Sequence, residues 1–480
     1  MDRQKGEQYE ESKYASNQEP SSANDLEEGI VASNTDSLQR HLNNRQIQLI
    51  AIGVSIGTAL FVSIGSGLEH GCPGSLLIAY TIQSFVLAMV NNSIAEMSTT
   101  YPVSSGFIRL TGKWVDDAIG FMVGLYEALL IPFEISAFTL VAFFWDLSLT
   151  SPGPHSCSLI NVLAVKAYGE AESWLSGGKV ILIFALFSFV FVTMVCGNPQ
   201  GDAYGFRYYD NPGAFLPYLS TDGRGRFQGF LAALWSAAFT ASPAEARRPR
   251  IDIKAAFKIF YVRFGIFFIG EVLAVGILSW RSWWNGSNGT AGASPYVIAM
   301  RNMGISVFPH IVNVLMLTSI FSAGNTYTYC AVRNLYGLAL EGRAPRVLAY
   351  TTRKGVSLYC FLVVMLFPLL SFLQVSNSSA IVIQWLAALT TSGGLIDFVV
   401  VCVTSIFFYR ACKAQGLDRN TLPYTGWGQP YCAIFGCFWM VLVAFFEGYT
   451  SFKPWSTASF FHSYTLQPLE PILFVFWKAV

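Results

Sequence analysis

Charged side chains are scarce in this chain of 480 residues. Asp, Glu, Lys and Arg make up 12% of it, against about 25% in ordinary soluble domains. Acidic residues are also unevenly placed, because nine of the 29 lie within the first 40 positions, so long later stretches carry almost no charge. This composition excludes a water-soluble globule.

Several other features are missing. The formal net charge is +1 and no basic patch occurs, which excludes a nucleic-acid partner, because such binding requires many phosphates to be neutralised. The nine cysteines are an odd number and most lie in apolar runs, unlike a disulfide scaffold. The five histidines form no cluster and no CxxC pair occurs. We therefore expect no metal site and no cofactor.

Apolar residues, by contrast, make up 53% of the chain. From Gln46 onward they form runs of about 20 residues, the length of a helix that crosses ~30 Å of hydrocarbon. The runs predict ten membrane spans, near 46–66, 74–94, 117–145, 174–196, 256–280, 307–332, 356–375, 380–409, 428–447 and 460–480. Two shorter apolar segments, 157–165 and 227–242, are too short for ordinary spans.

The charges in the loops indicate that both short segments cross the membrane. If they are counted, Lys and Arg gather in the even-numbered loops, as cytosolic loops require. The odd-numbered loops then carry the glycosylation patterns at Asn285, Asn288 and Asn377. We therefore expect an all-α polytopic membrane protein of about 12 spans, with spans 4 and 6 truncated and both chain ends in the cytosol. Residues 1–45 are polar and should form a disordered cytosolic tail.

The first span contains Gly53 and Gly57, with Ser55 and Thr58 beside them. These residues favour either of two structures. A break in the helix would direct backbone N–H groups at an anionic substrate group. Alternatively, the spacing of the two glycines is typical of close helix packing.

Ionisable residues within the spans are the next candidates. Glu127 and Glu134 lie on one face of the third span, and a carboxylate at this depth usually faces a polar cavity or is protonated. Glu134 suits a proton-coupling role better, because Glu127 can lie near the interface. Lys179 begins the fifth span, either in a functional role or as a cytosolic anchor whose ammonium group reaches water.

Several motifs are specific enough to indicate a family. They include LNNRQIQLIAIGVSIGTALF (42–61), IPFEISA (131–137), AYGEAESWLSGGKV (167–180) and SAGNTYTYCAVRNLYGLALEGRAP (322–345). At these residues the sequence resembles the fungal amino-acid permeases of the amino acid–polyamine–organocation superfamily. The resemblance covers about residues 40–478.

The resemblance implies a transporter fold of two inverted five-helix repeats. These would be residues 46–200 and 226–412, followed by spans 11 and 12 in residues 428–480. It also implies proton-coupled import of amino acids across the plasma membrane by a secondary active transporter, not an enzyme. Lys5 and Lys13 in the tail would be candidate acceptors for a ubiquitin ligase.

The family's functional residues carry over by position. Glu134 and Lys179 match residues linked to proton coupling. In the first span, the break would receive the substrate's α-carboxylate, and in the sixth an aromatic residue would cover the substrate. The substrate-binding positions are Ile56, Gly57, Thr58, Ala59, Phe239 and Thr240.

The sequence departs from the family pattern in three places. A Trp-Asn-aromatic stretch is missing after Gly124, most of the fourth helix is missing after Trp145, and the Gly-x-Glu break is missing after Thr240. These losses leave an alternative: a non-transporting or degenerate relative, either a regulatory or sensing protein or a misfolded product retained in the endoplasmic reticulum.

Overall fold

The chain's internal contacts divide it into two units, Met1–Asp36 and Ser37–Val480. A computed structural model describes, within the second unit, residues 60–61, 64–101, 106–124, 126–145, 165–238, 261–262, 264–278, 294–352, 357–375, 379–446, 448–452 and 455–479. The predicted tail, most of span 1, residues 157–164 of the short segment 157–165 and all six predicted substrate-binding positions lie outside the described residues.

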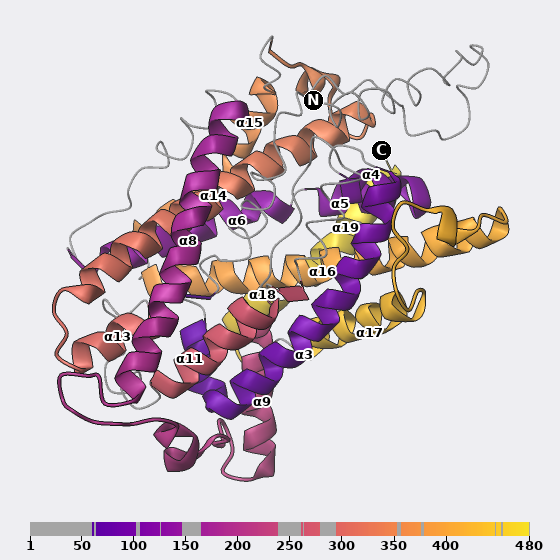
Figure 1. Ribbon diagram of the computed structural model, residues 1–480. Helices are drawn as coiled ribbons and strands as arrows, with labels where there is room; N and C mark the ends of the chain where they lie inside the picture. Colours follow the sequence, from indigo (N-terminus) through magenta and orange to yellow (C-terminus); the bar gives the residue numbers. More distant parts are fainter. Residues whose placement is uncertain are drawn as a thin grey trace, which may run out of the picture. The chain divides into compact units, whose positions relative to one another are not determined.

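The named elements of the described chain are all helices (Figure 1). The longer ones are α3 (Ile64–Thr100), α6 (Tyr126–Ala142), α8 (Val165–Met194), α9 (Gly223–Ala237), α14 (Phe308–Leu340), α16 (Ser379–Ala414), α17 (Tyr431–Phe446) and α19 (Leu466–Ala479). Shorter ones are α4 (Gly106–Trp114), α5 (Asp117–Val123), α11 (Gly270–Leu278), α13 (Pro295–Asn302), α15 (Leu358–Val364) and α18 (Thr457–Tyr464). The all-helical class is confirmed.

Several of these helices have the character of membrane spans. In the described chain, four helical stretches are long and apolar enough to cross a bilayer: Ile64–Thr100, Asp117–Ala142, Trp174–Met194 and Val382–Ala414. Three shorter helices are also apolar. The count of twelve spans stays a prediction.

Helix α3 contains the junction of the first two predicted spans. Its axis is interrupted at Cys72, where φ is 60° and ψ is 168°. Pro73 follows and lacks a backbone N–H, so it cannot continue the hydrogen bonding of a preceding helix. The N–H of Gly74 instead donates to the carbonyl of Ala214 at 3.0 Å.

Small residues bring α3 against α9. A Cβ atom added at Gly71 would lie 2.6 Å from the Cβ of Ala233 and 2.8 Å from the carbonyl oxygen of Gly229. Any side chain at Gly71 would therefore force the two helices apart. Close approach through small residues is the usual way in which helices associate in a membrane, where the hydrophobic effect does not drive them together.

Two predicted spans are broken where they were expected to be continuous. The spans over 356–375 and 460–480 each contain a second helix, the 3-10 helix Phe367–Val375 and α19. Pro368 and Pro468 lie in the first turns of these second helices, where a missing N–H costs little.

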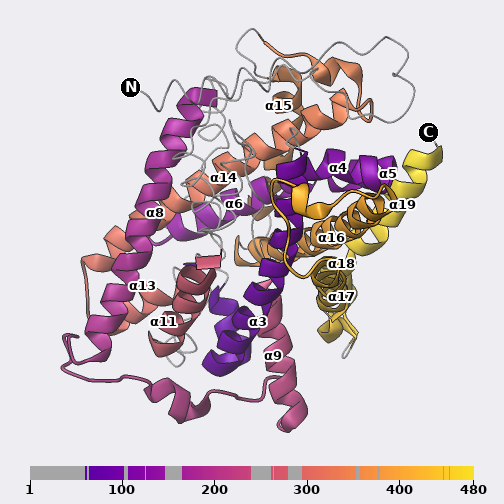
Figure 2. The same cartoon turned by 45° about the vertical axis from the view of Figure 1, so that its right-hand side comes forward.

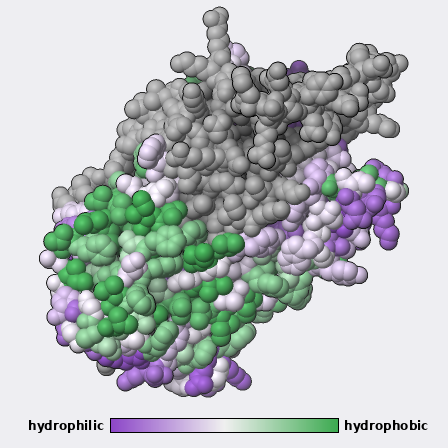
Figure 3. All heavy atoms as spheres, viewed as in Figure 1, coloured by the Kyte–Doolittle hydropathy of each residue, from purple (hydrophilic) through white to green (hydrophobic). Residues whose placement is uncertain are grey.

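An apolar outer face runs along α8. Trp174, Ile181, Phe184 and Phe191 are all at least half exposed. Figure 3 shows apolar side chains over the lower left of this view, where Figure 1 places α8 and α13. An exposed apolar surface of this kind marks contact with a partner or with lipid, and a bilayer would cover it.

Candidate functional site

Lys179 is buried in the middle of α8. Its side chain is 1% exposed, and it is among the largest fully buried side chains of the described chain. Because α8 begins at Val165, well before Lys179, the lysine does not lie at a helix end. A snorkelling anchor at the interface does not fit this position.

Glu172 lies on the same face of α8, two turns before Lys179. It is completely buried and interacts electrostatically with the lysine. The hydroxyl of Ser176, one turn after Glu172, donates to its Oε1 atom at 3.4 Å. The Glu172, Ser176 and Lys179 side chains thus form a polar stripe on an otherwise apolar helix.

The same carboxylate connects α8 to α14. The hydroxyl of Ser322 donates to Oε1 of Glu172, and Thr326, one turn later on α14, also hydrogen-bonds the carboxylate. Asn325 lies between them in sequence and is fully buried. Ser322, Asn325 and Thr326 are therefore buried on α14, and two of them hydrogen-bond Glu172 of α8.

Glu134 completes the site from α6. It is 2% exposed and interacts electrostatically with Lys179. Helix α14 packs against both α6 and α8, which brings the three helices together (Figures 1 and 2). Glu134, Glu172 and Lys179 are called the ion cluster below. The cluster contains two carboxyl groups and one amino group, so its formal charge is −1 when all three groups are ionised.

The backbone next to Glu134 is also unusual. Pro132, inside α6, lacks the N–H that would bond to the carbonyl of Ala128. The Ser136 hydroxyl donates to the carbonyl of Pro132 at 2.8 Å, and Gln374 donates to the Ser136 hydroxyl at 2.7 Å. Polar side chains therefore surround this turn of α6.

Comparison with known proteins shows the family of this chain. The family model for amino acid permeases matches residues 46–480. The chain belongs to the amino acid permease family. Members of this family are membrane transporters, so this permease is a multi-pass membrane protein of amino-acid transport and not an enzyme.

Individual relatives agree. This permease is 40% identical to the general amino acid permease AGP2 of Saccharomyces cerevisiae, over 92% of its own length and 79% of the relative's. It is 33% identical to the dicarboxylic amino acid permease of the same yeast, over 86% and 72%. It is 34% identical to the proline-specific permease of Emericella nidulans, over 89% and 82%.

Of the predicted site residues, the structure brings Glu134 and Lys179 together. Sequence reasoning missed Glu172, because residues 166–179 were expected to lie partly in a cytosolic loop before a span starting near 174. A signal was available: Glu172, Ser176 and Lys179 are spaced i, i+4 and i+7, which is one helical face.

A further buried carboxyl group lies outside the ion cluster. Glu271 on α11 is completely buried and faces the hydroxyl of Tyr296 on α13. It also interacts with Tyr80 of α3, whose hydroxyl donates to the carbonyl of Ser236 at 3.2 Å. Sequence pattern assigns no role to Glu271, and four helices meet around it.

The described residues contain no group of three or more His, Cys, Asp or Glu side chains that could hold a metal ion.

Proposed function

We propose that this permease imports amino acids across the plasma membrane together with protons. The observation that carries the proposal is the ion cluster, in which a buried lysine lies within electrostatic reach of two buried carboxyl groups. Net charge deep in a membrane protein is costly. Binding one proton brings the cluster from a formal charge of −1 to zero, so its charge state favours proton uptake.

The cluster is well placed to connect proton binding with helix movement. Glu172 is hydrogen-bonded to both Ser176 and Ser322, so a change in its charge acts on the contact between α8 and α14. Glu134 lies on α6, so the cluster also includes a side chain of this helix, which packs against α14. Protonation would in this way change the packing of three helices at once, which is how a bound proton can favour one state of a transporter over another.

The substrate site in this proposal is formed by the broken backbone of span 1 together with two residues of span 6. Ile56, Gly57, Thr58 and Ala59 would present N–H groups to the α-carboxylate of the amino acid. Phe239 and Thr240 would cover the substrate from span 6.

The wider organisation follows the family. We infer a cytosolic tail in residues 1–45 with Lys5 and Lys13 as ubiquitin acceptors, repeats in 46–200 and 226–412, and two more spans in 428–480. The arrangement of α15 and α4 toward one end of the unit, with α9 and α13 toward the other (Figures 1 and 2), supports two membrane faces, the first cytosolic.

The test is uptake of radiolabelled amino acids by permease-deficient yeast cells that express the chain. Uptake should be lost in the Glu134→Gln variant and when a protonophore is added. Glu470→Gln is the matched control, because it changes a carboxyl group in another predicted span, outside the cluster, and should retain uptake. A folded, surface-located protein that takes up none of the twenty amino acids would instead favour the non-transporting alternative.

A further inference from the structure

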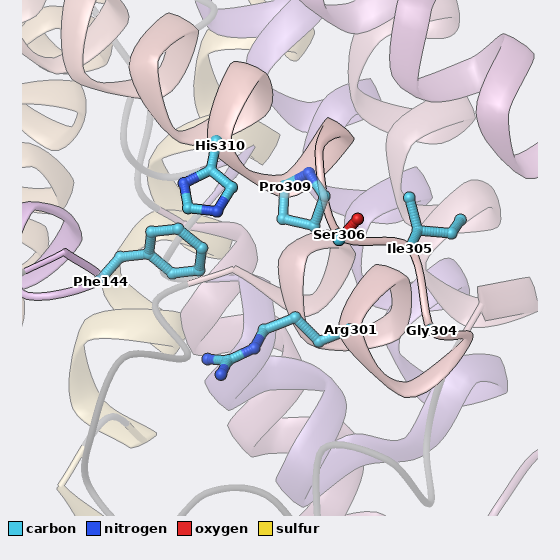
Figure 4. Close-up of a pocket in the computed structure, with 7 residues that line it drawn as sticks. All are labelled: Phe144, Arg301, Gly304, Ile305, Ser306, Pro309 and His310. Atoms are coloured by element: carbon cyan, nitrogen blue, oxygen red, sulfur yellow. The ribbon is translucent and has the colours of Figure 1, made fainter.

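A second polar site lies at one end of the permease, away from the ion cluster. A pocket of about 360 Å³ is formed by the residues after α6, the end of α13 and the start of α14, and Figure 4 shows its lining. This volume is in the range of small-molecule sites, about 300–1,000 Å³. The lining residues are Phe144, Arg301, Gly304, Ile305, Ser306, Pro309 and His310.

Arg301 supplies the charge in this pocket. Its guanidinium carbon lies 5.6 Å from the centre of the Phe144 ring, which is a cation–π contact. Within the described part of the permease, Arg301 forms no ion pair. The guanidinium is therefore held by an aromatic face that leaves its N–H groups available to a ligand.

His310 supplies a second hydrogen-bond donor. The indole N–H of Trp145 donates to Nδ1 of His310 at 2.9 Å, so Nδ1 acts as an acceptor and the proton of the neutral ring is on Nε2. The Phe144 ring also packs edge-on against the imidazole, with centroids 5.0 Å apart. Trp145 and Phe144 thus fix both the tautomer and the orientation of His310.

The lining side chains determine the kind of ligand. The guanidinium of Arg301, Nε2–H of His310 and the hydroxyl of Ser306 can all donate hydrogen bonds, and none of the seven lining residues carries a carboxylate. The pocket therefore favours an anion. A planar guanidinium matches the two oxygens of a carboxylate better than it matches a spherical ion such as chloride.

We propose that this pocket is an outer carboxylate-binding site, which captures an amino acid by its α-carboxylate before the substrate enters the transport path. The inference rests on the proposed function, because that function makes amino acids the ligands and places this end of the permease outside the cell. The pocket is open to solvent, since Arg301 and His310 are exposed, so the ammonium group and side chain of the ligand can remain in water.

The direct test measures occupancy at His310 and does not depend on transport. Purified full-length permease in lipid nanodiscs is treated with diethyl pyrocarbonate, and modification of His310 is quantified by peptide mass spectrometry. L-proline and propionate should slow the modification, whereas propylamine and sodium chloride at equal ionic strength should not. Equal protection by chloride, or no protection by either carboxylate, would overturn the proposal.

Variants then assign the effect to Arg301. Protection should be lost in Arg301→Gln and partly kept in Arg301→Lys, which retains the charge but not the planar fork. Arg224→Gln is the matched control, because Arg224 is an exposed arginine on the first turn of α9, outside the pocket. Full protection in Arg301→Gln would contradict the assignment.

Uptake provides a second measurement. Arg301→Gln should raise the external amino acid concentration for half-maximal uptake about fivefold, as expected for one exposed charge pair, with an unchanged maximal rate. Protection of His310 without uptake by any variant would retain the pocket and reject the transport proposal. Uptake with unchanged half-saturation in Arg301→Gln, and without protection of His310, would reject the pocket and retain transport.

Discussion

Arg419 holds Glu96 through two parallel hydrogen bonds, from Nε to Oε1 at 2.8 Å and from Nη2 to Oε2 at 2.7 Å. The carboxylate side chain is 4% exposed, and the N–H of Gly426 also donates to it at 3.0 Å. This contact joins the end of α3 to the segment between α16 and α17. Glu96 and Arg419 lie in two further segments at which the sequence resembles the permeases, AEMSTTYPVSSGF (95–107) and FFYRACKAQGLDRNTLPYTGW (407–427).

Replacing Glu96 should therefore destabilise the permease. Glu96→Gln leaves Arg419 without its anionic partner, and we expect a loss of about 2 kcal/mol, seen as a lower melting temperature of the purified protein in detergent. Asp202→Asn is the matched control, because Arg207 also donates two hydrogen bonds to Asp202, at 2.8 and 2.6 Å, but on an exposed loop. Exposed pairs contribute little, so equal shifts for the two variants would contradict this interpretation.

A glycine beside Arg343 gives a second stability prediction. A Cβ atom at Gly112 would lie 1.8 Å from Nη2 of Arg343, and this buried guanidinium pairs with Asp117. Gly112→Ala should displace Arg343 and cost about 2 kcal/mol. Gly106→Ala, on the same helix with no atom within 4 Å of the added Cβ, should be neutral or slightly stabilising. The measurement is the melting temperature of both purified variants. Equal melting temperatures would contradict the prediction.

Glu172 should affect proton coupling, and its hydroxyl partner should not. In Glu172→Gln, the remaining Glu134 and Lys179 are neutral as a pair without an added proton, so uptake should fall and no longer rise as the external pH falls. Ser322→Ala removes one hydrogen bond to Glu172 but keeps the charge, so uptake should decrease while its stimulation by acid remains. Measuring uptake at several external pH values separates the two outcomes, and acid stimulation that persists in Glu172→Gln would count against the cluster.

The proposed topology can be tested with a thiol that is already present. Cys196 is exposed in the turn after α8, which the topology places outside the cell. A membrane-impermeant maleimide should label Cys196 on intact cells, and Arg346→Cys, in an exposed cytosolic turn, only after permeabilisation. Peptide mass spectrometry identifies the labelled residue, and labelling of Arg346→Cys on intact cells would reverse the orientation.

Sequence reasoning predicted the positions of most described helices because long apolar runs have few alternatives in a bilayer. It failed at helix breaks. Pro368 and Pro468 both lie within runs whose mean hydropathy favours a continuous span, and a window of about 20 residues does not detect a local break. Residues of this type indicate a possible helix boundary. The prediction instead followed the length of the apolar run.

The candidate site was predictable only in part. Glu134 and Lys179 could be identified singly, since an ionisable group within an apolar run is usually functional. The sequence could not predict that these two side chains lie close together, because their distance depends on how α6, α8 and α14 pack. The bond between Ser322 and Glu172 joins residues 150 positions apart, and no local pattern encodes such a contact.

The central claim is that protons drive amino-acid uptake through the ion cluster. The most direct measurement uses purified permease in proteoliposomes, with an acid-outside pH gradient, a radiolabelled amino acid and a pH-sensitive dye inside. We predict accumulation of the amino acid above its external concentration together with internal acidification, both lost in Glu134→Gln. Uptake that only equilibrates, at the same rate with and without the gradient, would contradict the account.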